Sequence, residues 1–570
     1  MCSDDPSLGR SQVLNGNAGR DIGGAGAAKS AGAVGDATMR RLPCLVLVTA
    51  LAGGAILIGA TGPVPILYAA SDVAIYLDAC YNVSKHLVLG RDFFSPIGPS
   101  ALLPTALAMR LGGATVGALA YGAILAWLGY GTVAWLTARS RMNHWLAVGF
   151  ALFAAATASA PYSLDFGSWR ALSYSLLYNR MAWTAICIAA VPAFLPAEKQ
   201  LNQREWTLFG YGACAALLAL NKPNYLLMLA PLTLWILGPE VGTWRKLLAK
   251  LGGFISGAIL AATVIWLCVP YDPIGIFRET FEMGRGAPVD LLYYTLKRSL
   301  LENWVPFGCL ACCWIAFVAL SSKGKVRRVA WKSFLLFLAV STCVFLANTT
   351  NCQFKEFPVF GAFGWILAAI CMRGWKRGRG IAVLAAVGVA MGVAFAWQPW
   401  ISFPYSFVAK YLRPPRTGDA LAVNSYRWAG MPMQHFPTEE SDASFDSDKS
   451  AADYANWLND GLALLSRFRP QQCRVLSLDW SNPFPFALGL DPLIGEQVAW
   501  HVGRTLGPLH HPDMGHLLAQ AGVVMEPKRP GQPLSTGLKR ALILERLNAD
   551  FRVMGESACW RIWVRVSTQH

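Results

Sequence analysis

Long apolar segments recur along most of the chain, and they constrain the fold more than any motif does. The first, residues 42–61, is long enough to cross the hydrocarbon core of a bilayer, which takes about 20 apolar residues. Chain exposed to lipid must satisfy its own backbone hydrogen bonds, so helices are expected. Ten further segments of spanning or near-spanning length follow: 113–138, 145–160, 180–197, 207–221, 225–238, 251–270, 306–321, 334–347, 358–372 and 381–398.

The composition agrees with a mainly α polytopic bundle of about eleven transmembrane helices. The chain is 54% hydrophobic and only 14% charged, which leaves more apolar surface than a soluble protein of 570 residues buries. Its net charge of +16 could suggest nucleic acid, but the basic residues form short clusters between apolar segments rather than one polar face. The expected partner is therefore membrane lipid, and no nucleic acid.

Alternate loops collect lysine and arginine, as the positive-inside rule requires of cytoplasmic loops. The basic loops follow or precede the apolar segments near residues 40, 140, 200, 245, 325 and 375, whereas the intervening loops carry most of the acids. This alternation predicts that the N-terminus is cytoplasmic. An odd number of spans then predicts that the acidic loops and everything after about residue 400 are extracytoplasmic.

Three regions differ in composition. Residues 1–40 are rich in Gly, Ala and Ser and are expected to be a disordered cytoplasmic segment. Residues 41–399 form the membrane module, with a first outer loop at 62–112 and another at 271–305. Residues 400–570 predict a small soluble α/β domain, with a helix over 453–468 and strands near 474–478 and 561–566. The sequence contains no GxGxxG and no P-loop.

Metal and cofactor signatures are weak. Most of the fourteen cysteines fall in or beside apolar segments, and no pair of CxxC motifs occurs, so we interpret them as packing residues. Four histidines near the C-terminus lack the spacing of zinc ligands: His501, His510, His511 and His516. No cofactor is certain from the sequence.

The first outer loop carries the most informative acid, Asp72, which lies just beyond the first span. A carboxylate at that depth is partly desolvated and is a functional candidate. The alternative is structural, because Ser71 or Asp72 could cap the amphipathic helix expected from Val73 to Leu89 and ended by Gly90. Asp78, six residues after Asp72, has a weaker claim as a partner.

The order of these features resembles the GT-C superfamily of membrane glycosyltransferases. The resemblance covers residues 42–360: an acid soon after the first span, a helix, GRDFFSPIGP at 90–99, YNRMAW at 178–183 and NKPNY at 221–225. It implies a bacterial plasma-membrane enzyme with a helical bundle and an outer domain. Such an enzyme transfers a sugar from a polyprenyl-phosphate donor to an extracytoplasmic glycan, glycolipid or protein.

The resemblance also implies roles for individual residues. Asp72 would be the catalytic base, and Asp92 could share a divalent metal, Mg or Mn, with it, although some members need no metal. Asp78 is the other candidate partner. Arginines and lysines would hold the donor phosphate unless they only anchor the chain to lipid headgroups. The candidates are Arg180 and Lys222, which lie in short polar breaks, and Arg170, Arg278, Arg285, Lys297, Arg298 and Lys355.

Two loops and the function itself keep alternatives. Residues 271–302 predict either a mobile cover over the site or two interfacial helices, and residues 478–490 either a sugar-stacking surface or a packed strand end. Besides a glycosyltransferase, the chain could be a transporter or flippase of lipid-linked glycans, or a non-catalytic envelope assembly protein. Transporters often contain internal repeats. We find no convincing repeat in this sequence.

Overall fold

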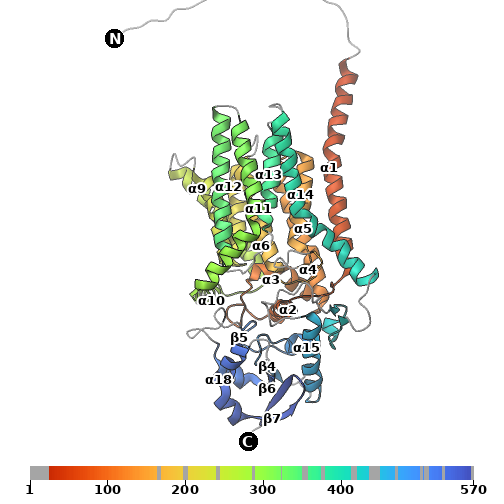
Figure 1. Ribbon diagram of the computed structural model, residues 1–570, viewed down its shortest axis with the longest axis vertical. Coiled ribbons are helices and arrows are strands. Elements are labelled where there is room, and N and C mark those ends of the chain that lie inside the picture. The colour runs from red at the N-terminus through yellow and green to blue at the C-terminus, as the bar shows by residue number, and fades with distance from the viewer. Residues whose placement is uncertain are drawn as a thin grey trace, which may run out of the picture.

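Two layers follow one another along the long axis of the molecule (Figure 1): a bundle of long helices, and a smaller unit with a β-sheet against one end of it. We call this the domain-proximal end of the bundle and the opposite one the domain-distal end. The computed structural model describes residues 25–162, 169–196, 203–238, 244–285, 289–321, 324–349, 357–373, 379–412, 420–434, 450–468, 473–500, 505, 512–528 and 533–566.

Each of the eleven predicted spans corresponds to a helix in the described part of the chain. Six helices contain a segment that is long and apolar enough to cross a membrane. They are α1 (Ala25–Thr61), α4 (Gly117–Ala138), α9 (Trp244–Cys268), α11 (Val289–Leu320), α12 (Lys325–Asn348) and α14 (Arg379–Phe407). The other five are α5 (His144–Ser159), α6 (Leu177–Phe194), α7 (Gln203–Ala219), α8 (Leu226–Leu237) and α13 (Pro358–Arg373). The predicted polytopic helical fold is confirmed.

Small residues allow neighbouring helices of the bundle to approach closely. Where α7 crosses α9, a Cβ atom added to Gly212 would collide with the backbone carbonyl of Phe254, and one added to Gly257 with that of Phe209. Such contacts are typical of membrane helices, whose association depends on close van der Waals packing. The outer surface is apolar: Leu45 on α1 and Ile259 on α9 are exposed, as side chains that face lipid should be.

The N-terminal segment differs from the prediction. Helix α1 begins at Ala25, so the expected disorder is wrong from that residue onward, and residues 1–24 lie outside the described residues. The helix continues toward the N-terminus from the apolar span because the preceding stretch is rich in alanine, the residue with the highest helix propensity.

Helix α2 (Ala70–Ser84), in the first outer loop, also differs from the prediction. It ends at Ser84 rather than Leu89, because the amide of Lys85 closes it on Tyr81 and Asn82 and His86 adopts a left-handed φ of 65°. It is not an amphipathic interfacial helix, since every residue from Val73 to Val83 is buried. Its neighbours are α3 (Pro99–Gly112), α15 (Ala451–Ser466) and α16 (Phe484–Leu488).

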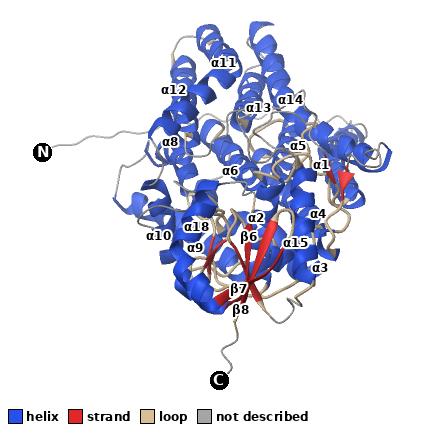
Figure 2. Ribbon diagram, turned by 60° about the horizontal axis from the view of Figure 1, so that its bottom comes forward, coloured by secondary structure: helices blue, strands red, loops and turns tan. Residues whose placement is uncertain are grey.

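The C-terminal unit is the predicted small α/β domain. Its sheet has the order β4-β6-β8-β7, with β4 (Arg474–Ser477) parallel to β6 (Ala521–Pro527) and the other pairs antiparallel. The remaining strands are β7 (Phe551–Glu556) and β8 (Trp560–Arg565). Helix α15 packs on β8, α17 (Met514–Gln520) on β4 and β6, and α18 (Pro533–Asp550) on β7. Figure 2 shows the strands between α15 and α18.

This domain is joined to the first outer loop by several contacts. Strand β1 (Phe93–Phe94) pairs in parallel with β5 (Glu496–Gln497), and β3 (Met433–Gln434), paired with β2 (Ala420–Leu421), bridges to Ile66. The ring of Phe486 on α16 lies 5.8 Å from that of Tyr81 on α2, edge to face. Residues 478–490 are thus the packed alternative: Phe484 and Phe486 are buried, and no sugar-stacking face is formed by them.

The second outer loop adopts the helical alternative. Helix α10 (Pro273–Arg285) precedes α11, which begins well before the span predicted from residue 306. The start of α10 lies against the turn at Gly90, whose φ of 86° and contact with Asp272 and Ile276 leave no room for a Cβ atom. The loop therefore packs on the first outer loop.

Candidate active site

Asp72 lies in the first turn of α2, at the domain-proximal end of the bundle. Its Oδ2 accepts a hydrogen bond of 3.2 Å from the hydroxyl of Ser175, and its side chain is partly exposed. The N-cap of α2 is Ala69, which has no side chain to cap the helix, so neither Ser71 nor Asp72 is the N-cap. The first turn of a helix favours a negative charge, which helps keep Asp72 ionised.

Ser175 reaches Asp72 because a short loop is tied to the segment before α2. The amide of Leu67 donates to the carbonyl of Leu172, and Ser173 Oγ donates to the carbonyl of Tyr68 at 2.8 Å. The same Ser173 oxygen accepts from the amide of Ser175 at 3.0 Å. These bonds fix the loop immediately before α6, so the hydroxyl of Ser175 is oriented by the fold.

Lys222 is brought to the same start of α6. Its ammonium group lies 4.5 Å from the ring centroid of Tyr178, and the side-chain amide of Asn221 donates to the Tyr178 carbonyl at 3.0 Å. The partly exposed side chain of Lys222 follows α7 and precedes the short helix Pro223–Tyr225. Asp72 and Lys222 thus lie on opposite sides of one segment, which carries Ser175 and Tyr178.

Arg180 is in the same segment but is bound to the protein. It is 1% exposed, its Nε and Nη2 donate to the carbonyl of Tyr162, and its guanidinium lies 4.0 Å from the Tyr162 ring centroid. Next to it, Asn179 is fully buried, and neither atom of its amide has a partner among the described residues. The role predicted for Arg180 at the donor phosphate stays a prediction.

The two other acids of the first outer loop have partners of their own. Asp92 forms an ion pair with Arg91 at 2.8 Å and accepts from the amide of Val88, and the Arg91 hydrogen bond lowers the pKa of Asp92. Asp78 is buried beneath the C-terminal domain, where burial and the nearby carboxylate of Glu496 raise its pKa well above the usual value. Neither contact is with Asp72.

The remaining phosphate candidates are dispersed. Arg170 stacks on Trp169 at 5.0 Å, Arg278 and Lys297 are exposed, and Arg298 bonds Tyr294 at 3.1 Å and approaches Glu302 at 4.0 Å. The side chain of Arg285 and all of Lys355 lie outside the described residues, as do three of the four histidines: His501, His510 and His511.

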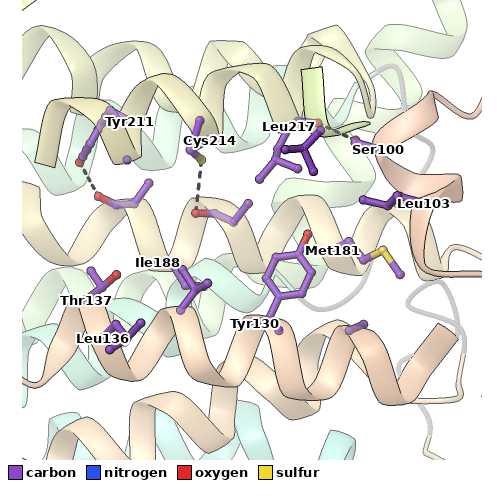
Figure 3. Close-up of a pocket in the computed structure, with 18 of the residues that line it drawn as sticks. Ser100, Leu103, Tyr130, Leu136, Thr137, Met181, Ile188, Tyr211, Cys214 and Leu217 are labelled. Atoms are coloured by element: carbon purple, nitrogen blue, oxygen red, sulfur yellow. Dashed lines mark hydrogen bonds between the residues drawn. The ribbon is translucent and has the colours of Figure 1, made fainter. Parts of the chain in front are cut away.

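A cavity of about 890 Å³ opens between α3, α4, α6, α7 and α9 (Figure 3). Ser100 marks its domain-proximal end, where its hydroxyl donates to the carbonyl of Leu217 at 2.7 Å and its amide to that of Leu220. Met181, one turn beyond Tyr178, also lines this end. The lining is mostly aliphatic, and the cavity begins close to the backbone that carries Asn221 and Lys222.

No protein-family profile matches the sequence, and no curated protein of similar sequence was found. One solved structure has a related course of chain. It is ArnT from Cupriavidus metallidurans bound to undecaprenyl phosphate, with 92% of this chain and 98% of that chain covered at 10% identity and a TM-score of 0.44. The likeness concerns the course of the chain and no individual residue. A helical bundle with a small α/β domain is also what the resemblance to the GT-C superfamily implies.

The described residues do not fit the shared metal site. They contain no group of three or more His, Cys, Asp or Glu side chains that could hold a metal ion. Asp92 is neutralised by Arg91, which leaves Asp72 without a second carboxylate ligand of that kind. The chemistry proposed below uses no metal.

A second set of buried titratable groups lies where the domain meets α2 and α10. Burial raises the pKa of Glu496 to about 7 and that of Glu279 to about 8, and Asn482 donates to both carboxylate oxygens of Glu496. Burial also lowers the pKa of Lys539 to about 7, and its ammonium lies 3.8 Å from the ring centroid of Trp500. No motif in the sequence predicts this cluster.

Proposed function

We propose that the chain is an integral membrane glycosyltransferase that transfers a hexose or pentose from a polyprenyl-phosphate donor to an extracytoplasmic acceptor. The observation that carries the proposal is the contact between Ser175 and Asp72. It holds a partly exposed carboxylate in a fixed orientation at the end of a helical bundle, beside a partly exposed lysine and the mouth of an apolar cavity.

The reaction needs a base and an anion site. Asp72 accepts the proton of an acceptor hydroxyl as its oxygen bonds to the anomeric carbon, and the bond from that carbon to the phosphate oxygen breaks. Polyprenyl phosphate leaves with the electron pair. Lys222 stabilises the negative charge that develops on the phosphate, because a fixed cation near a low-dielectric region interacts strongly with it.

The cavity provides a place for the isoprenoid chain of the donor. Its domain-proximal end adjoins the backbone before Lys222, so a phosphate on that lysine would leave the chain to enter between Ser100 and Met181. Aliphatic walls suit an isoprenoid chain, which brings no polar group that needs a partner.

The test is Asp72→Asn in the full chain, reconstituted in nanodiscs with polyprenyl-phosphate-linked hexoses and pentoses and a mixture of envelope acceptors. Loss of a general base lowers the rate by about 10²- to 10⁴-fold. Asp491→Asn is the matched control, because Asp491 is an exposed acid paired with Lys85 on the surface. Transfer by Asp72→Asn at the wild-type rate would exclude Asp72 as the base.

One observation favours a second function, the transport of a lipid-linked glycan. The cavity extends from Ser100 to Arg141, beyond the last residue of α4, and so runs along most of the bundle. A transporter would move labelled lipid between leaflets of a vesicle in the absence of any acceptor, and Asp72→Asn would leave that movement intact.

A further inference from the structure

The domain-distal end of the cavity contains a cation in an otherwise apolar lining. Arg141, just beyond α4, is 8% exposed and lines the cavity together with Thr137, Ser140 and Thr207. In Figure 3, Thr137 and Tyr211 lie at the opposite end of the cavity from Ser100 and Leu103. This end is remote from Asp72 and Lys222, so its polar groups serve neither of them.

Arg141 has hydrogen-bond partners but no counterion in the described part of the chain. Its Nη1 donates to the Thr137 carbonyl at 3.0 Å and the Ser140 hydroxyl at 3.1 Å, and its Nη2 donates to the Thr207 hydroxyl at 2.9 Å. Its Nε is buried and has no acceptor among the described residues. All three partners are neutral.

The nearest charge has the wrong sign. Arg373, at the end of α13, donates through Nη2 to the carbonyl of Arg141 at 2.7 Å. Burial lowers the pKa of Arg141, and the charge of Arg373 lowers it further. A buried cation without a counterion costs several kcal/mol, so two neighbouring arginines at the end of a cavity favour an anion there.

The cavity opens sideways toward the bilayer. Leu125, Val133 and Leu136 on α4 and Trp206 on α7 line it and are between 37% and 70% exposed on the bundle surface, at 40%, 51%, 50% and 69% respectively. From Leu125 to Arg141 the helix rise gives a length of about 24 Å, most of the thickness of a hydrocarbon core. A ligand that enters through this opening comes from the membrane.

We propose that Arg141 binds the phosphate of an anionic glycerophospholipid from the domain-distal leaflet, with the acyl chains of that lipid in the cavity. Hydroxyl groups of Thr137, Ser140 and Thr207 surround the phosphate, and Arg373 adds a second positive charge. A polyprenyl-phosphate sugar is a poorer occupant in this orientation, because its sugar would lie at the end of the bundle opposite Asp72. The proposal does not depend on the reaction proposed above.

The test measures lipid retention by native mass spectrometry of the full chain, purified with phosphatidylglycerol or with phosphatidylcholine as the probe. We expect the wild type to retain phosphatidylglycerol preferentially and Arg141→Gln to retain it about tenfold less, because a charged hydrogen bond is replaced by a neutral one. Arg139→Gln is the matched control, since Arg139 is exposed and adjacent in the sequence.

A second variant keeps Arg141 and removes the space for the acyl chains. Gly210 lines the cavity, and a Cβ atom added there meets no other atom within 4 Å, so Gly210→Leu fills the cavity without a clash at the backbone. We expect it to lose phosphatidylglycerol while its melting temperature in detergent stays unchanged. This variant decides the question if Arg141→Gln fails to fold.

Four results would overturn the proposal. They are equal retention of both phospholipids by the wild type, unchanged retention by Arg141→Gln or by Gly210→Leu, displacement of the lipid by inorganic phosphate, and selective retention of polyprenyl phosphate over phosphatidylglycerol. The third would identify a soluble anion as the ligand, and the fourth the isoprenoid donor.

Discussion

Ser175 is the residue on which the geometry of the candidate site depends most directly. Its hydroxyl approaches Asp72 from a loop more than a hundred positions away in the sequence, and two serine contacts hold that loop. If Asp72 is the base, Ser175 acts through it as a positioning residue, since no contact of Ser175 with the reacting atoms is required.

Ser175→Ala should lower kcat and leave KM for the donor nearly unchanged. The lost hydrogen bond to a charged group contributes about 1.5–3 kcal/mol, so the rate should fall by about tenfold or more. Ser175→Thr, which retains the hydroxyl, should recover most of it. Steady-state kinetics of both variants provide the measurement, and a change in KM alone would mean that Ser175 binds substrate instead.

The buried carboxyl of Glu279 makes stability depend on pH. Its pKa is about 8 in the folded chain and 4.5 when unperturbed, so between these values the folded state keeps a proton that the unfolded state loses. Stability is therefore highest below pH 4.5 as far as this group is concerned, and it falls as the pH rises toward 8.

Glu279→Gln should remove this part of the pH dependence, because an amide of the same size does not ionise. We expect the variant to melt above the wild type at pH 8 and the difference to shrink toward pH 4.5. Glu545→Gln, at an exposed position, is the control. Parallel melting curves for wild type and Glu279→Gln across this range would contradict the pKa.

Single-residue chemistry was only partly predictable from the sequence. Asp72 could be singled out because an acid directly after an apolar span is unusual, and Lys222 because it interrupts two short apolar segments. Ser175 and Tyr178 carry no such signal, since serine and tyrosine are ordinary in any loop and their roles arise only from tertiary contact. The burial of Asp78 likewise required the position of Glu496.

At the scale of elements, apolar length predicted the helices of the bundle, but local pattern failed for α2. Its alternating apolar and polar residues suggested a helix half in water, and the C-terminal domain covers the polar side instead. Asn82 and Asp78 are buried, which sequence periodicity cannot reveal. Binary patterning describes one helix at a time and omits a domain that packs on it from the far end of the chain.

The contact of α16 with α2 should be a main source of cohesion between domain and bundle. Phe486 is 1% exposed and lies edge to face with Tyr81 at 5.8 Å and Trp428 at 5.7 Å. Removing a buried phenylalanine side chain costs about 3–5 kcal/mol, so Phe486→Ala should unfold or release the domain at lower denaturant concentration.

Limited proteolysis of Phe486→Ala in nanodiscs, followed over a denaturant series, measures this effect. Tyr426→Ala is the control, because Tyr426 is 69% exposed and its loss should change stability by less than about 0.5 kcal/mol. Equal protease resistance of Phe486→Ala and the control would show that the strand pair β1–β5 holds the domain without this ring.

For the whole molecule, the predicted topology has a direct test. Cysteines placed at Gly324, before α12, and at Ser466, at the end of α15, are both at exposed positions and belong to opposite ends of the structure. In intact cells an impermeant maleimide should label only the Ser466 position, and the Gly324 position should need permeabilised membranes. Labelling of both from outside would reverse the proposed location of Asp72.

The pairing of β1 with β5 also has a consequence for biosynthesis. Roughly 400 residues separate the two strands, and at a synthesis rate of about 5–20 residues per second β1 waits about 20–80 s for its partner to leave the ribosome. The spans can insert one after another during that time, whereas the wall over α2 cannot close. A nascent chain halted after α14 should therefore be inserted and still bind chaperones through the uncovered surface of α2.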